Sequence, residues 1–187
     1  QTILGAHLLW QKTLAEPDPE TFQAILQGQT IQKIGRRAKY ITLNLTESIL
    51  VIHLRMSGDL RVEPTQNPIL KHDRLTLDFD SGWRLSFNDP RKFGRVWLVR
   101  DTQNLFSSLG PEPDDPALTP ERFHEMLKKR SRAIKPLLLD QHFLAGLGNI
   151  YTDESLFRAN LHPLRYSDTI TLQDAAKLLE SIRATLA

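Results

Sequence analysis

The sequence predicts an α+β protein in which a β-sandwich domain is followed by a helical domain. Up to about residue 100, short stretches alternate between apolar and polar residues and are separated by turn-forming residues. After a proline-rich segment, the apolar residues recur at helical spacing instead. Short strands joined by tight turns favour a sandwich or barrel over a parallel sheet. We therefore predict a β-sandwich domain over residues 1–109, a linker over 110–118 and a helical domain over 119–187.

Five strands and one helix are expected in the first domain. The two stretches on either side of Asp80-Ser81-Gly82 read as the arms of a hairpin. The helix is expected to follow Pro17-Asp18-Pro19, because proline and aspartate are common at helix starts. The predicted strands cover residues 39–45, 49–54, 74–79, 83–87 and 95–99, and the predicted helix covers 20–27.

The linker and the helices of the second domain follow from proline positions and capping residues. Residues 109–116 contain three prolines and three acidic residues, a composition typical of a connecting segment. Thr119 is a good N-cap and is followed by Pro120, so a helix should begin there. The apolar side chains of this helix and of the next one are Phe123, Met126, Leu127, Ile134, Leu137 and Leu138.

Two further helices are expected towards the end of the chain. Asn149 follows the glycine turn Gly146-Leu147-Gly148 and is expected to cap a helix that stops around Asn160-Leu161-His162-Pro163, with proline as the breaker. Thr171 is expected to begin a last helix that continues to residue 187.

Composition excludes several classes of protein and site. The chain has 0 cysteines, which rules out disulfides and thiolate metal sites and is compatible with a reducing cytoplasm. No apolar run is long enough to span a membrane, and the first residues lack the layout of a signal peptide. The formal net charge is only +2 at pH 7, so the distribution of Lys and Arg matters more than their excess.

Two segments in the second domain could bind a nucleic-acid backbone. Gly146-Leu147-Gly148-Asn149-Ile150-Tyr151 places exposed amides at a helix N-terminus, an arrangement suited to a phosphate. The segment 128–135 holds five basic residues and no acidic one. Taken alone, the first could equally be an ordinary helix–helix turn, and the second a solvated helix face.

Three segments in the first domain could contact DNA. Met56 follows an apolar strand and is expected on an exposed loop that ends at Gly58. An exposed methionine suits insertion between bases. Arg91 and Phe93 lie two residues apart, so both could point the same way, one to a base edge and one as a wedge. Residues 35–39 place three basic side chains before a strand, which suits the lip of a DNA-binding groove. The alternatives are a Met and a Phe folded onto the core and a basic surface turn.

Taken together, these segments resemble the bacterial formamidopyrimidine-DNA glycosylase (MutM-type) family. The most specific part runs from Leu137-Leu138-Leu139-Asp140-Gln141 through 146–157 to His162-Pro163, and it resembles the family's helix–two-turns–helix signature. The segments 36–40, 53–56 and 89–94 occur in the family's order and spacing, so the resemblance covers nearly the whole chain.

The resemblance implies a fold, a partner and a set of site residues. DNA would lie between a β-sandwich domain and a helical domain. Met56 would fill the gap left by an extruded nucleotide, Arg91 would contact the widowed cytosine and Phe93 would wedge beside it. The residues that would hold phosphates are His53, Lys135, Asn149 and Lys39, with Lys39 also near the catalytic centre; Tyr151 would line the helical turn and Glu154 would be an acid of the catalytic set.

The resemblance also implies the chemistry. An N-terminal proline amine would attack the anomeric carbon, expel an oxidised purine and leave an iminium, and elimination would then cleave the strand at the apurinic site. The partner would be double-stranded DNA that contains oxidised purines or abasic sites, bound by a monomer in the bacterial cytoplasm at the nucleoid.

Two of the family's features are absent from this sequence. The proline-led segment does not precede Gln1, and the family's four-cysteine zinc finger cannot be formed without cysteine. We therefore expect a truncated chain that binds DNA poorly and cleaves nothing by itself, whereas the full-length protein is expected to hold zinc.

Two alternatives remain at this point. One is a non-catalytic homologue that binds damaged DNA, and the other is a glycosylase of the sister branch that removes oxidised pyrimidines. The trio Met56, Arg91 and Phe93 favours the purine branch.

Overall fold

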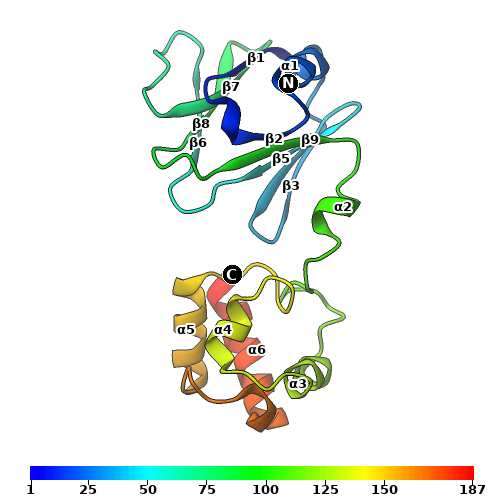
Figure 1. The fold of residues 1–187 in the computed structure, drawn as a ribbon, viewed down its shortest axis with the longest axis vertical. Coiled ribbons are helices and arrows are strands. Elements are labelled where there is room, and N and C mark those ends of the chain that lie inside the picture. The colour runs from blue at the N-terminus through cyan, green and yellow to red at the C-terminus, as the bar shows by residue number, and fades with distance from the viewer. The chain divides into compact units, whose positions relative to one another are not determined.

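The computed structural model describes residues 1–187 and divides the chain into two compact units. The β unit comprises Gln1–Asn104 and the helical unit comprises Leu105–Ala187. Figure 1 shows that the strands are confined to the β unit, where the short helix α1 accompanies them. This architecture is the predicted β-sandwich domain followed by a helical domain.

The β unit is built from two sheets. One has four strands in the order β1-β7-β8-β6 and is antiparallel; the other has five in the order β2-β9-β5-β4-β3, antiparallel except for the pairing of β2 with β9. The strands of the first sheet are β1 (Ile3–Leu8), β6 (Asp59–Pro64), β7 (Asp73–Phe79) and β8 (Trp83–Asn88). Those of the second are β2 (Leu14–Glu16), β3 (Lys33–Arg37), β4 (Tyr40–Asn44), β5 (Ile49–His53) and β9 (Arg95–Val99).

Apolar side chains from both sheets and from α1 (Pro19–Leu26) form a single core. Side chains along β7 point alternately into this core and away from it. Leu75 and Leu77 belong to the core cluster, whereas Arg84 of β8 binds Asp78 of β7 on the opposite face. The interior residues of the second sheet that join the core are Leu43, Leu50, Ile52, Val96 and Leu98.

The five strands predicted from alternation are present, and four further strands were missed. Every missed strand, β1, β6, β2 and β3, lies at the edge of its sheet. Residues 35–37, for which a basic surface turn was the alternative reading, belong to β3, and only Ala38 and Lys39 connect this strand to β4. The predicted helix over 20–27 is α1, which begins one residue earlier and is capped by the Asp18 carboxylate.

The helical unit contains α3 (Pro120–Lys128), α4 (Ile134–Leu139), α5 (Asn149–Ala159) and α6 (Leu172–Leu186) around its own apolar core. A short helix α2 (Gln103–Phe106) spans the division between the units. As predicted, Thr119 and Thr171 cap α3 and α6, since each hydroxyl accepts the amide of the third residue after it. Phe123 and Leu127 are fully buried, with Met126 packed against the same core.

The predicted cap at Asn149 was wrong by one position. Gly148 is the N-cap of α5 and Asn149 is the first helical residue, so its side chain is free to face solvent. The helix ends at the predicted stretch 160–163, since its C-cap is Asn160, but the predicted role of Pro163 as the breaker was wrong. Asn160 adopts a left-handed conformation with φ of 55°, which terminates the helix without any contribution from proline.

The segment predicted as a linker, residues 110–118, is packed into the helical unit. Leu118 is fully buried, and the amide of Gly110 donates to the carbonyl of Gln141. The Arg183 guanidinium of α6 donates to the carbonyls of Pro113 and Leu118. The prolines therefore shape a packed connection, and the division of the chain lies earlier, between Asn104 and Leu105.

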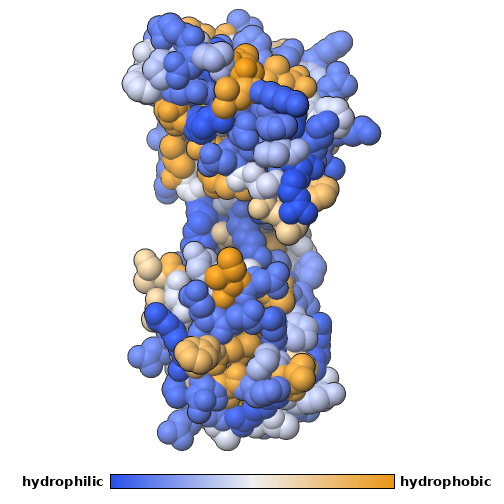
Figure 2. Space-filling model, turned by 90° about the vertical axis from the view of Figure 1, so that its left-hand side faces the viewer, coloured by the Kyte–Doolittle hydropathy of each residue, from blue (hydrophilic) through white to orange (hydrophobic).

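The surface is mainly hydrophilic on the face that Figure 2 shows, where hydrophobic side chains form separate small groups in each unit. None of the helices combines the length and the apolar character that a membrane span requires.

Candidate nucleic-acid interface

The strand register brings three loops to one end of the five-stranded sheet. Tyr40 of β4 pairs with His53 of β5, and His53 pairs in turn with Arg95 of β9. Lys39 immediately precedes the first of these residues, and Gly94 immediately precedes the last. The β3–β4 turn, the loop after β5 and the loop before β9 therefore meet at the same edge.

Two of these loops cross between the sheets side by side. Residues 54–58 connect β5 to β6, and residues 89–94 connect β8 to β9. Because β5 pairs with β9 and β6 pairs with β8, the two crossings begin and end on neighbouring strands. We call them the methionine loop (54–58) and the arginine loop (89–94).

The side chains predicted to enter DNA lie at the surface of these loops. Met56 is 75% exposed and Phe93 is 51% exposed, so neither is folded onto the core. The guanidinium carbon of Arg91 lies 5.1 Å from the centroid of the Phe93 ring, which places both side chains on one side of the loop. Lys92 turns elsewhere, since its amino group lies 3.8 Å from the Trp10 ring centroid.

Each of the three loops contains a non-glycine residue in the left-handed region. The φ angles are 52° at Ala38, 58° at Arg55 and 61° at Lys92. Outside glycine, such conformations are uncommon and cost about 1 kcal/mol each. Their concentration at one edge is typical of a functional surface whose backbone geometry is imposed by its surroundings.

The surroundings of His53 keep its imidazole neutral. Burial, followed by the positive charges of Arg55 and Lys39, lowers the pKa of His53 to about 4. The Nδ1 atom accepts the Arg55 amide at 3.0 Å. The proton of the neutral ring therefore sits on Nε2, which becomes a hydrogen-bond donor without a full charge.

Lys39 shares this environment. Its side chain is partly buried, and burial together with the charge of Arg55 lowers the pKa of its ammonium group. Tyr40 packs edge-on against the His53 ring, with centroids 4.7 Å apart. The β unit thus places a donor imidazole and a lysine with a weakened hold on its proton beside the exposed loops.

Sequence reasoning missed the residue that organises the arginine loop. The carboxylate of Asp89 is buried and accepts hydrogen bonds from the amides of Gly94 at 2.7 Å and Arg91 at 3.2 Å. It also accepts the Ser57 hydroxyl from the methionine loop at 2.6 Å. The Asp-Pro pair signalled a turn in the sequence, but nothing in it indicated a carboxylate that is shared by two loops.

In the helical unit, the turn between α4 and α5 is held by Gln141, also missed from the sequence. Its side-chain oxygen accepts the Gly146 amide at 3.0 Å, and its nitrogen donates to the carbonyls of Leu139 and Leu147. Gly146 has φ of 109°, which requires glycine. The first intrahelical bond of α5 is made by Thr152, so the amides of residues 149–151 precede it and carry the positive end of the helix dipole.

Lys135 lies against this helix start. Its amino group forms an ion pair with Asp153 of α5 at 2.7 Å, and both side chains are partly exposed. Asn149, Tyr151 and Glu154 are exposed on the same helix. The remaining basic segment is not a helix face, because α3 ends at Lys128 and residues 129–133 connect it to α4.

Two further basic side chains of the segment 128–135 bind partners within the helical unit. Lys128 donates to the carbonyl of Asp168, and Arg132 pairs with Asp140.

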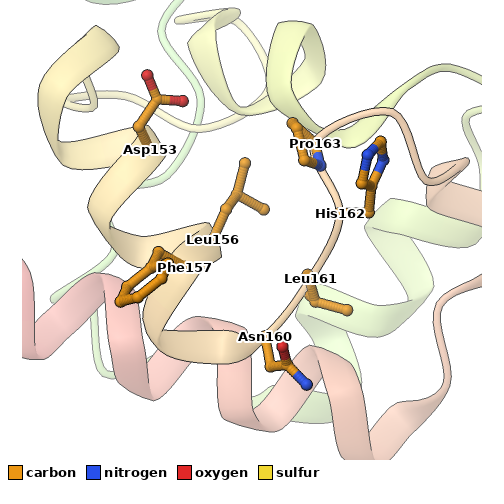
Figure 3. Close-up of a pocket in the computed structure, with 7 residues that line it drawn as sticks. All are labelled: Asp153, Leu156, Phe157, Asn160, Leu161, His162 and Pro163. Carbon is orange, nitrogen blue, oxygen red and sulfur yellow. The ribbon is translucent and has the colours of Figure 1, made fainter.

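A pocket of about 390 Å³ lies between α5 and the chain that follows it, beside Lys135. Figure 3 shows Asp153, Leu156 and Phe157 projecting from α5, opposite the chain from Asn160 to Pro163 that follows it. None of the predicted DNA-contacting residues lines this pocket, but Asp153 connects its rim to Lys135.

The two units of the chain match two domains of one known protein family. Residues 1–96 match the N-terminal domain of formamidopyrimidine-DNA glycosylase, and residues 109–187 match its H2TH (helix–two-turns–helix) domain. The chain belongs to the formamidopyrimidine-DNA glycosylase family. The formamidopyrimidine-DNA glycosylase of Protochlamydia amoebophila is 44% identical over 98% of this chain and 67% of its own length.

Solved structures of the formamidopyrimidine-DNA glycosylase family agree with this assignment. The Lactococcus lactis enzyme, bound non-covalently to DNA containing an AP site, is similar with a TM-score of 0.91 and 35% identity. The similarity covers 97% of this chain and 71% of that one. A second structure of the same enzyme, in complex with DNA containing FAPY-dG, gives the same TM-score and identity over 97% of this chain and 70% of the other.

Proposed function

We propose that this protein is a DNA repair enzyme that flips oxidised purines out of duplex DNA, excises them and then cleaves the strand at the apurinic site. Glycosylase activity follows from the family. The observation that supports the proposal for this chain is the exposed group Met56, Arg91 and Phe93, presented by two adjacent loops beside His53 and Lys39.

In the β unit, we assign insertion into the base stack to the exposed trio. An apolar side chain that enters a duplex unstacks a base step and bends the DNA, and the energy is recovered in new contacts. Met56 and Phe93 supply the apolar surfaces, and Arg91 supplies paired donors for the base left without its partner. Extrusion exposes the glycosidic bond, which is shielded in stacked DNA.

In the helical unit, we assign phosphate binding to the start of α5. Amides at a helix N-terminus attract an anion, and the exposed side chains of Asn149 and Tyr151 lie at the same turn. Lys135 adds a positive charge to the same turn. Its ammonium group can leave Asp153 and bind a phosphate instead, because a partly exposed ion pair contributes at most about 1 kcal/mol to stability. In the β unit, the Nε2–H of His53 would donate to a backbone phosphate.

The chemical step requires a nucleophile, and we assign none among residues 1–187. The family resemblance implies a proline amine that forms a bond to the anomeric carbon while the bond to the base breaks and the base leaves with the electron pair. The adduct becomes an iminium when the bond between C1′ and the ring oxygen breaks and the oxygen takes up a proton. Loss of a C2′ proton from this iminium then breaks the bond between C3′ and its oxygen, and the 3′ phosphate leaves with the electron pair. Lys39 and Glu154 are the residues that we propose as the catalytic set of this chain, and proton transfer is the role for which the lowered pKa of Lys39 is suited.

Zinc, implied for the full-length family member, does not fit the residues present. The chain has 0 cysteines, and no group of three or more His, Asp or Glu side chains is placed to hold a metal ion. We therefore assign no step to a metal, and zinc remains a proposal about the full-length protein.

Borohydride trapping tests the proposal. The full-length protein expressed from its gene is incubated with duplexes containing 8-oxoguanine, an oxidised pyrimidine or no lesion, and covalent adducts and released bases are measured. We expect adducts and base release with the oxidised purine. Lesion binding without any adduct would instead support the non-catalytic homologue, and preferential release of the pyrimidine would support the sister branch.

A further inference from the structure

The arginine loop and the methionine loop are joined at the end of β8. Asp89 directly follows this strand, is 1% exposed and binds the backbone of its own loop through the amides of Gly94 and Arg91. The same carboxylate accepts the hydroxyl of Ser57, which lies 32 positions earlier in the chain. This is a direct side-chain hydrogen bond between the loop that carries Met56 and the loop that carries Phe93.

The Phe87 ring forms a second joint beneath the same two loops. It is 1% exposed and belongs to the core. A Cβ atom on Gly58 would lie 2.8 Å from this ring, and a Cβ atom on Gly94 would lie 2.3 Å from it. Both loops therefore rest on one aromatic ring at positions where only glycine fits.

Hydrogen bonding keeps Asp89 ionised despite its burial. Burial alone would raise its pKa, but the hydrogen bonds from Ser57 and from the amides of Gly94 and Arg91 outweigh it and lower the pKa. A charged acceptor strengthens each of these bonds relative to a neutral one.

We infer that Ser57 and Asp89 are positioning residues that make the methionine loop and the arginine loop one rigid unit, so that Met56 and the Arg91–Phe93 pair enter the duplex together. The inference rests on the proposed function, because it specifies how the inserted side chains are held. Ser57 acts through the loop that it fixes and has no role in contacting a base.

Ser57→Ala is the sharpest variant, because it removes the bond between the loops and leaves the bonds of Asp89 within its own loop. Ser81→Ala is the matched control: its hydroxyl also donates over 2.6 Å, to Gln1, but it lies at the opposite end of β8. Ser57→Thr keeps a hydroxyl and should restore the wild-type behaviour.

Hydrogen exchange of residues 54–58 in the protein without DNA provides the first measurement. A hydrogen bond to a charged group is stronger than one between neutral groups, so exchange should accelerate about tenfold or more in Ser57→Ala. It should be unchanged in Ser81→Ala. Equal exchange in the two variants would overturn the inference.

Binding to a duplex with a tetrahydrofuran abasic-site analogue provides the second measurement, using the full-length protein. Met56→Ala and Arg91→Ala are combined in a double-mutant cycle, once with Ser57 and once with Ser57→Ala. With Ser57 present, the losses should be non-additive by about fivefold, and without it they should be additive. Additive losses in both backgrounds would contradict the coupling.

The proposed function can fail separately. If the unaltered protein bound the abasic-site duplex and an undamaged duplex equally, the assignment to lesion DNA would be wrong. The exchange comparison would still decide whether Ser57 couples the loops.

Discussion

Acid should destabilise the β unit through a single buried imidazole. The pKa of His53 in the folded protein is about 4, against 6.5 for an ordinary histidine, because of burial and the charges of Arg55 and Lys39. Between these two values the unfolded chain binds the extra proton and the folded chain does not. The free energy of unfolding therefore falls as the pH is lowered through this window, by about 2 kcal/mol at pH 5 and about 3 kcal/mol once both forms are protonated.

Urea unfolding at pH 7, 6 and 5, followed by tryptophan fluorescence, measures this loss. All three tryptophans, at positions 10, 83 and 97, belong to the β unit, so the signal reports that unit. In His53→Asn the Oδ1 atom takes the place of Nδ1 and can still accept from Arg55, but the side chain does not titrate, so most of the pH-dependent loss should disappear. His7→Asn, which replaces an exposed histidine in the other sheet, is the control. Parallel losses in the unaltered protein and in His53→Asn would refute the reasoning.

Three other perturbations address the loops and the DNA contacts. Gly58→Ala should destabilise the β unit by about 2 kcal/mol in the same urea assay, because the added Cβ would lie 2.4 Å from the Leu54 carbonyl oxygen. Arg91→Ala should reduce discrimination of the base opposite the lesion, whereas Lys135→Ala should weaken binding to all duplexes and lower the salt-dependence slope by about 1; identical behaviour of the two in salt titrations would contradict these roles. Asp153→Asn should free Lys135 and tighten DNA binding at low salt, an effect that should vanish in the Lys135→Ala background.

Strand position within a sheet explains what could be predicted of the fold. The five strands found from alternation are the interior ones, and interior strands such as β7 must bury alternate residues on a core shared by two sheets. Edge strands such as β3 have one neighbour and tolerate charged side chains, so Lys33–Arg37 carries no clear period. The buried Leu118 was missed for a different reason: the surrounding prolines and acidic residues dominate the local composition and hide a single apolar residue.

The candidate site was predictable at its surface but not in its supports. Met56, Arg91 and Phe93 combine unusual residue types with loop positions, and their exposure confirms the loop placement made from sequence. Asp89 supports the two loops of the β unit through Ser57, a partner 32 positions away that only the fold supplies. In the helical unit, Gln141 supports the α4–α5 turn through bonds within six residues that the sequence alone did not single out. A polar residue in a turn has many local uses, and its long-range partner leaves no local pattern.

The three left-handed residues have a consequence for anyone who engineers this protein. Glycine at Ala38, Arg55 or Lys92 would relieve the backbone strain, but it would also raise the conformational entropy of the unfolded chain by a similar amount. Each of these positions lies in a loop that also carries a side chain assigned to DNA. Glycine there would therefore add little stability and would loosen the backbone that holds these side chains.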